Sequence, residues 1–257
     1  IRDTDRSRGL GDVYKRQFEN VYGLTKFKNG EENIQNHIEN RFRDIGYTVK
    51  SKILYASDFG VPQRRNRLFI VGNRNGIDFE FPKEFDYSVS VDEAISDLPV
   101  LGNGEIQMKG EYTVPFEQAS PYAQLMRKKS KAPTQNIVSR NKDYVVERYK
   151  YIGQGENWSS IPDRLMENYA DKKRCHSGIY KRLIGGKPSV VISNYRKSML
   201  IHPHQDRGLS VREAARLQSF PDHFIFEGPV SYVQQQIGNA VPPLLAKAVM
   251  KKILTYK

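Results

Sequence analysis

Two segments near the end of the chain carry most of its structural information: GLSVREAARLQSFPD (residues 208–222) and QIGNAVPP (residues 236–243). In the first segment, Ser210 and Glu213 have the spacing of a capping box, so a helix is expected to begin there. In the second, GNAVPP is typical of a turn that opens a helix, because a first helical turn tolerates proline. Apolar residues follow the prolines at helical spacing: Leu244, Leu245, Ala248, Val249 and Ile253.

The first hundred residues alternate between strand and helix patterns. Residues 31–45 place apolar side chains three and four positions apart, and Gly46 stands where a left-handed helix end is expected. Residues 47–53 alternate between apolar and polar side chains like a strand, and the run LFIVG (residues 68–72) is typical of a strand buried on both faces. A second capping box is SVDE (residues 90–93). This order predicts an α/β fold.

The middle of the chain has a different pattern. From about residue 101 to residue 204 no helical period is sustained, and Tyr, Asn, Ser and Gly are frequent. Because a compact domain does not contain a hundred residues of structureless loop, we expect a separate, small and irregular domain there.

The composition is that of a soluble protein suited to a polyanionic partner. Of the 257 residues 38% are hydrophobic and 27% charged, and the net charge is +12. Excess Lys and Arg permits binding to nucleic acid, since these side chains neutralise phosphates. No apolar run of eighteen residues and no signal pattern occur, so the sequence does not support membrane insertion or secretion. A single cysteine, Cys175, suits a reducing cytoplasm.

Residues 1–17 differ from the rest of the chain. They contain five basic and three acidic residues and show no apolar periodicity. They resemble the translation of a sequencing adapter; the alternative is a native basic arm. We treat this segment as a non-native tail and leave it out of the fold.

Two further motifs lie upstream of the two segments quoted first. FENV (residues 18–21) suits the end of a strand that enters a loop, and PQRRNR (residues 62–67) is a basic loop before the buried strand. With the two segments near the end of the chain, in this order, they resemble the DNA cytosine-5 methyltransferase family of restriction-modification systems. The resemblance covers residues 18–257. It implies a cytoplasmic protein of a prokaryote or phage that acts on double-stranded DNA.

The resemblance also implies a fold and its boundaries. Residues 18–100 would form the C-terminal half of a catalytic α/β domain, with a partial Rossmann-like methyltransferase sheet. Residues 101–206 would form a small target-recognition domain that reads base edges, each bidentate contact giving about 1 to 3 kcal/mol of discrimination. Residues 207–257 would supply helices that return to the catalytic domain, where Arg212, Glu213 and Arg216 are expected to have structural roles.

The arginine-rich loop is the first candidate site. In an extended segment Arg65 and Arg67 project to the same side, so both could reach one phosphate or one base edge. The alternative is a solvated basic loop. The resemblance implies that Arg65 and Arg67 engage the target cytosine and nearby backbone, and we expect Gln63 and Arg64 to contact DNA.

Glu19 is the second candidate. The resemblance implies a carboxylic acid that hydrogen-bonds ring nitrogen 3 of the cytosine; burial that keeps such an acid protonated would let it donate a proton. The alternative is an ion-pair partner for a nearby arginine. For the last motif, the resemblance implies that Asn239 and Val241 line a site for S-adenosylmethionine. No metal site is expected.

Two parts of the family pattern are absent from this sequence: the glycine-rich cofactor strand and the Pro-Cys nucleophile loop. Cys175 does not replace that nucleophile, because it follows Arg174 and lies after Glu19 instead of before it. We therefore expect the chain alone to be inactive. Two hypotheses follow: part of a methyltransferase, truncated or naturally split, that needs an N-terminal half, or a DNA-binding module without chemistry.

Overall fold

The computed structural model describes residues 15–29, 32–167 and 177–256. They divide into two compact units, each with its own packing. The first unit holds the described residues up to Tyr55, residues 66–83 and the residues from Ala248 on. The second holds residues 56–65 and 84–247, apart from the undescribed ones.

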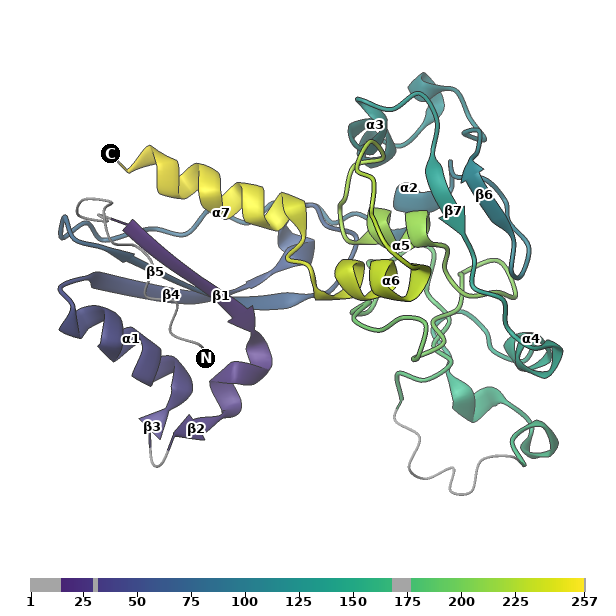
Figure 1. Cartoon of the computed structure of the whole chain (residues 1–257), viewed down its shortest axis with the longest axis horizontal. Helices are drawn as coiled ribbons and strands as arrows, with labels where there is room; N and C mark the ends of the chain where they lie inside the picture. The colour runs from purple at the N-terminus through teal and green to yellow at the C-terminus, as the bar shows by residue number, and fades with distance from the viewer. Residues whose placement is uncertain (1–14, 30–31, 168–176, 257) are drawn as a thin grey trace. The chain divides into compact units, whose positions relative to one another are not determined.

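The first unit is built on a three-stranded sheet in the order β1-β5-β4. Strands β1 (Lys15–Val21) and β4 (Thr48–Tyr55) both pair antiparallel with the central strand β5 (Asn66–Asn73). The apolar run of β5 is buried on both faces, with Leu68 and Ile70 fully inaccessible, which confirms the prediction for this strand. Helix α1 lies along one side of the sheet and the end of α7 along the other (Figure 1).

Helix α1 (Ile34–Asp44) begins three residues later than predicted. The preceding residues form the small hairpin of β2 (Lys28–Asn29) and β3 (Glu32–Asn33), and the Asn33 side chain caps the helix by accepting from the Gln35 N–H at 2.8 Å. Gly46 has a φ of +86°, so the predicted left-handed helix end is confirmed. A 3₁₀ turn, η1 (Tyr22–Lys26), connects β1 to the hairpin.

Strand β1 starts at Lys15 and pairs along its whole length, from Lys15 opposite Asn73 to Val21 opposite Arg67. The strand therefore includes the last three residues of the segment set aside as a tail. Lys15 also donates from Nζ to the Ile253 carbonyl of α7 at 3.2 Å.

The described part of the second unit consists mostly of short helices, with a small two-stranded antiparallel sheet. The helices are α2 (Val91–Ile95), α3 (Pro121–Arg127), α4 (Asp143–Tyr149), α5 (Val211–Leu217), α6 (Val230–Asn239) and the start of α7 (Pro243–Thr255). The small sheet pairs β6 (Ile106–Lys109) antiparallel with β7 (Thr134–Ile137), and helix α3 lies in the connection between the two strands. The 3₁₀ turns are η2 (Ala56–Phe59), η3 (Phe116–Gln118), η4 (Trp158–Ser160) and η5 (Asp163–Leu165). Both predicted capping boxes are present, at the starts of α2 and α5.

The core of the second unit surrounds α5, all of whose residues are buried. Arg216 lies at 0% exposure between two carboxylates, 2.8 Å from Asp97 and 2.7 Å from Asp222. Glu213 binds Arg207 at 2.7 Å, and Arg212 donates to the Thr134 and Phe224 carbonyls. These contacts fit the structural roles expected for the charged residues of this helix.

Two expectations about local structure need correction. Gly238 and Asn239 end helix α6 instead of forming a turn that opens a helix; α7 starts only at Pro243. The region from residue 101 to 204 contains helices α3 and α4, of seven residues each. Two turns are too short to establish a helical period in a sequence, which is why the pattern missed them.

Candidate functional site

Glu19 and Arg67 form an ion pair in the first unit. The Arg67 Nε lies 2.8 Å from the Glu19 Oε1. The arginine side chain is only 7% exposed, whereas that of Glu19 is 27% exposed. Burial lowers the pKa of the Arg67 guanidinium, and the Glu19 carboxylate opposes that shift. The pair thus consists of a buried guanidinium group and a carboxylate that is partly exposed to solvent.

Strand pairing brings these two residues together. In the β1–β5 ladder Val21 is opposite Arg67 and Glu19 is opposite Phe69. Residues two apart on a strand share a face, so Glu19 and Arg67 are diagonal neighbours across the ladder, within reach of long side chains. The contact that the sequence offered as an alternative for Glu19 is therefore present.

The loop between β4 and β5, residues 56–65, belongs to the second unit and is called the arginine loop below. It starts with η2, and Gly60 takes a φ of +75°. The loop is tied to the chain near Ser189: the Arg64 N–H donates to the Ser189 carbonyl at 2.8 Å, and the Ser189 N–H donates to the Pro62 carbonyl at 2.9 Å. These backbone bonds hold the loop in one conformation.

The last three residues of the arginine loop, Gln63, Arg64 and Arg65, differ in exposure. Arg64 is exposed, whereas Gln63 is fully buried and Arg65 is 3% exposed. Gln63 was expected to contact DNA, but its side-chain amide donates to Gln218 and to the Leu217 carbonyl and accepts from the Ile192 N–H. In this structure it therefore organises the protein interior.

Arg65 binds the end of helix α6. Its Nη2 donates to the Gly238 carbonyl at 2.7 Å. A cation is favourable there because the end of a helix presents carbonyl groups with partial negative charge. Arg65 and Arg67 are thus used differently: Arg65 binds within the second unit and Arg67 within the first.

The end of α6 also carries the two residues expected at a cofactor site. Asn239 is exposed and Val241 is partly exposed. Gly238 is buried against the chain at Ser193: a Cβ added there would lie 1.6 Å from the Ser193 carbonyl oxygen, so only glycine fits. This close packing fixes the backbone that presents Asn239.

Gln218 is the residue at this site to which the sequence had assigned no role. It is fully buried and caps α5, and its Nε2 donates to the Ile237 carbonyl at 2.9 Å and the Ala240 carbonyl at 2.8 Å. The sequence around it, LQSF (residues 217–220), did not indicate a buried role, since a glutamine after an amphipathic helix is ordinarily exposed.

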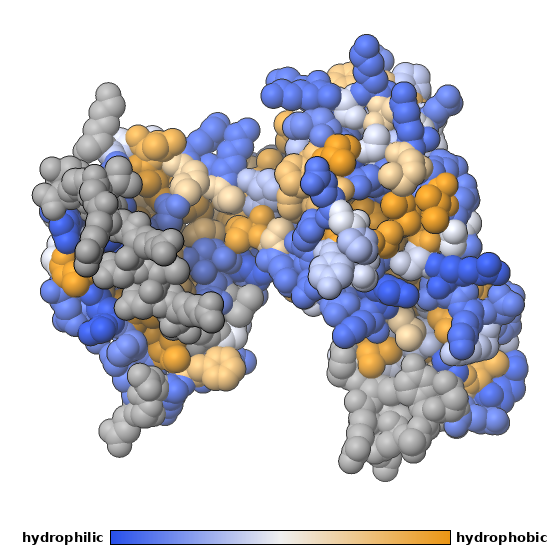
Figure 2. Space-filling model, viewed as in Figure 1, coloured by the Kyte–Doolittle hydropathy of each residue, from blue (hydrophilic) through white to orange (hydrophobic). Residues whose placement is uncertain are grey.

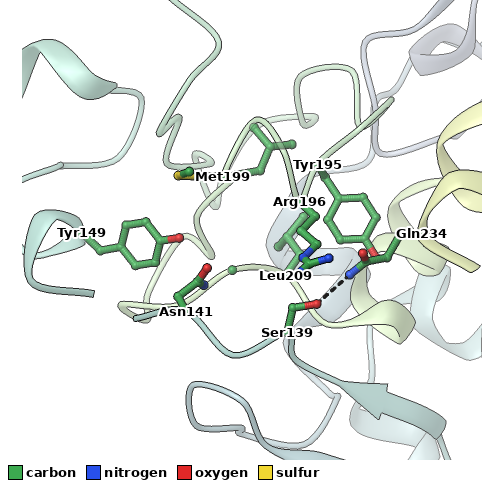
Figure 3. Close-up of a pocket in the computed structure, with 10 residues that line it drawn as sticks. Ser139, Asn141, Tyr149, Tyr195, Arg196, Met199, Leu209 and Gln234 are labelled. Carbon is green, nitrogen blue, oxygen red and sulfur yellow. Dashed lines mark hydrogen bonds between the residues drawn. The ribbon is translucent and has the colours of Figure 1, made fainter. Parts of the chain in front are cut away.

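The second unit also has a small, partly open pocket of mixed polar and apolar lining, with Tyr149, Tyr195 and Gln234 among its residues (Figure 3). Its volume of about 20 Å³ has room for a single water molecule. Burial raises the pKa of the Tyr195 hydroxyl. Gln234 donates to the Ser139 hydroxyl at 2.9 Å. A pocket of this size does not accept a cofactor or a base.

The exterior of the second unit carries basic side chains around the β6–β7 sheet and between α3 and α4. The exposed basic residues are Lys109, Lys128, Lys129, Lys131, Arg140 and Lys142. On the face shown in Figure 2, hydrophilic side chains surround smaller apolar patches. Such a surface suits contact with phosphates.

Three further points concern Cys175, metal binding and membrane insertion. Cys175 and the cationic residues before it lie outside the described residues. Among the residues that the structure does describe, no three His, Cys, Asp or Glu side chains gather as a metal site would require. None of the described helices is both long enough and apolar enough to cross a membrane.

The known proteins whose sequences are similar to this chain are DNA methyltransferases by name. A model of the family "C-5 cytosine-specific DNA methylase" matches residues 17–255. Type II methyltransferase M1.HphI of Haemophilus parahaemolyticus is 34% identical over 92% of this chain and 55% of its own length. Type II methyltransferase M.DdeI of Desulfomicrobium norvegicum is 33% identical over 93% of this chain and 62% of its own length.

A solved structure supports the same fold. A protein described as a prophage-encoded DNA modification methyltransferase (E. coli) has a TM-score of 0.66 at 22% identity, covering 94% of this chain and 69% of that one. The mixed α/β fold expected from the sequence is thereby confirmed. The chain spans only about half to three fifths of the length of the curated relatives named above.

Proposed function

The chain belongs to the C-5 cytosine-specific DNA methylase family, and we propose that it is the C-terminal part of a DNA cytosine-5 methyltransferase of a restriction-modification system. The complete enzyme would transfer a methyl group to carbon 5 of a cytosine in a specific double-stranded sequence. The type II methyltransferase names of its relatives support this assignment.

The observation that carries the proposal is the Glu19–Arg67 pair. Arg67 holds the carboxyl group of Glu19 from one side at 2.8 Å while Glu19 stays 27% exposed. As an ionised carboxylate the group only accepts hydrogen bonds, and the ion pair favours that form; to donate to ring nitrogen 3 it must first take a proton, which its exposed part can receive from solvent. We assign Glu19 to ring nitrogen 3 of the target cytosine, with Arg67 as the residue that orients it.

Reaching that nitrogen requires the base to leave the duplex, because stacking and pairing cover it. The enzyme would flip the cytosine out at a cost of a few kcal/mol. We assign Arg65 to the same step as the residue that fixes the arginine loop on α6, and exposed Arg64 to contact with the DNA backbone.

The methyl donor of the proposed reaction is S-adenosylmethionine. The exposed amide of Asn239 can donate and accept hydrogen bonds, and Val241 offers an apolar surface, so the two residues fit a ligand that has both polar groups and an aromatic ring. We assign them to one wall of the cofactor site, on a backbone that Gly238 and Arg65 hold in place.

DNA recognition is assigned to residues 101–206. Their exposed Lys and Arg side chains would bind phosphates, and polar loop residues would read the bases. Residues 207–247 pack in the same unit, so helix α5 and the C-terminal end of α6 would support recognition as well as catalysis. We expect the protein to act in the cytoplasm of a prokaryote or in phage infection.

The chain alone is proposed to be inactive, because its sequence lacks the glycine-rich cofactor strand and the Pro-Cys loop. An N-terminal half would supply both, as the coverage of the relatives suggests. The second candidate is a DNA-binding module without chemistry, which the net charge of +12 permits.

Complementation separates the two candidates. The chain is combined with the N-terminal part of M.DdeI, and transfer of labelled methyl groups to DNA is measured for the wild type and for Glu19→Gln. We expect transfer with the wild type and a loss of about 10²-fold or more with the variant, the range of a lost general acid. Asp78→Asn, an exposed carboxylate of the same unit, is the matched control and should retain activity.

Near-normal turnover by Glu19→Gln would remove the role assigned to Glu19. Binding to DNA that weakens steeply with salt, without methyl transfer in any combination, would favour the binding module.

A further inference from the structure

Helix α6 ends without a left-handed residue. Its C-cap, Ala240, is extended, with φ −62° and ψ 148°. The last carbonyl groups of a helix lack partners within the helix, and a left-handed glycine often supplies them. Here side chains from elsewhere take that place: Gln218 donates to the Ile237 and Ala240 carbonyls, and Arg65 donates to the Gly238 carbonyl.

The same glutamine is joined to the arginine loop. The Gln218 side-chain oxygen accepts from the Gln63 Nε2, and both side chains are fully buried. Gln63 in turn accepts from the Ile192 N–H at 3.2 Å. One continuous chain of hydrogen bonds therefore runs from Ile192 through Gln63 and Gln218 to the end of α6.

We propose that Gln218 is a positioning residue that couples the arginine loop to the turn carrying Asn239 and Val241. A glutamine suits this place because one amide both accepts from Gln63 and donates twice to α6. In a buried site none of these groups can turn to water instead, so a shift at one end disturbs the bonds at the other. The inference rests on the proposed function, since it links the arginine loop, which we assign to the DNA, to the turn that we assign to the cofactor.

A simple helix cap would behave differently. If Gln218 only closed α6, its loss would loosen residues 237–240 and leave the far side of Gln63 unchanged. If it couples the two segments, its loss also frees Gln63 and exposes the Ile192 amide, which Gln218 does not contact. The Ile192 amide is therefore the decisive reporter.

Amide hydrogen exchange of the full chain, in the absence of DNA and cofactor, tests the coupling. Gln218→Met keeps the length of the side chain and removes its hydrogen bonds. We expect exchange at both Ala240 and Ile192 to become about tenfold faster or more. The matched control is Gln234→Met, another buried glutamine of the same unit, whose partner is Ser139 (Figure 3); it should leave Ile192 unchanged.

Unchanged exchange at Ile192 in a folded Gln218→Met chain would overturn the coupling, and so would an equal acceleration in Gln234→Met. If Gln218→Met does not fold, Gln63→Met tests the same coupling in the opposite direction, from the arginine loop to the end of α6. Its readout is the Ala240 amide, which donates to the Gln236 carbonyl of α6 and not to the arginine loop. Wild-type exchange there would overturn the proposal, and faster exchange would support it.

A kinetic measurement then tests whether the coupling reaches the cofactor. In the complex with the M.DdeI N-terminal part, Gln218→Met should raise KM for S-adenosylmethionine about tenfold, with a smaller change for DNA, whereas Gln234→Met should change neither. An unchanged KM for S-adenosylmethionine in the Gln218→Met complex would overturn the positioning role. If the wild-type complex does not methylate DNA at all, the proposed function fails while the exchange result still decides the coupling.

Discussion

Arg67 and Arg216 are both buried arginines that meet carboxylates, yet their surroundings differ. Arg216 is fully enclosed by Asp97 and Asp222, neither of them more than 2% exposed. Among the described residues Arg67 meets one carboxylate, that of Glu19, and this side chain is 27% exposed. A closed cluster has every charge matched within the protein and nothing left for a ligand. An open pair keeps a fixed carboxyl group within reach of a ligand. The exposure of the carboxylate partner therefore separates a structural arginine from a candidate for chemistry.

The comparison can be tested first by breaking the closed cluster. Arg216→Met should lower the free energy of unfolding by about 3 to 5 kcal/mol, because two buried carboxylates lose their shared cation. Urea unfolding followed by circular dichroism measures this. The Arg43–Glu39 pair, whose arginine is 49% exposed, provides the control, and Arg43→Met should cost less than about 1 kcal/mol. Equal losses for the two variants would mean that burial of the cluster does not determine its contribution.

A second test uses pH within the same enclosed region. His202 packs beside Glu213 and Arg207, and burial lowers its pKa from 6.5 to about 4. The unfolded chain therefore binds a proton below pH 6.5 that the folded chain does not, so stability falls as pH drops from 6.5 towards 4. The loss between pH 7 and pH 5 should be about 2 kcal/mol.

His202→Asn should remove this part of the pH dependence. Glu213, whose pKa is lowered to about 2, contributes stability above its ordinary value of 4.5 that is lost only as pH falls towards 2, so the two groups act in separable windows. Unfolding curves at pH 7, 6 and 5 provide the measurement. An unchanged slope in the variant would show that His202 is not the titrating group.

The open pair should give the smallest effect on stability. Glu19→Gln keeps the shape of the side chain and an oxygen that can still accept from Arg67, so the free energy of unfolding should fall by only about 1 to 2 kcal/mol. The same urea unfolding measures it. A loss as large as that of Arg216→Met would place Glu19 among the structural residues and would weaken its assignment to chemistry.

Local patterns predicted those elements whose signals lie within a few residues. The capping boxes at Ser90 and Ser210, the left-handed Gly46 and the buried strand around Ile70 all formed as expected. Helix α6 was missed because its buried face is narrow and half polar, with Val233, Gln234, Ile237 and Gly238. An apolar period cannot show where a glutamine and a glycine take core positions.

The sequence by itself determined the order of the motifs, the starts of the capped helices and the presence of an arginine loop before a buried strand. Only the tertiary structure decided what those motifs touch. Arg65 meets Gly238 and Gln63 meets Gln218, across separations of 173 and 155 residues. Local propensity acts over a few residues, whereas such contacts depend on how whole elements pack. The physical roles of the loop residues, buried for Gln63 and exposed for Arg64, therefore emerged only when the chain was folded.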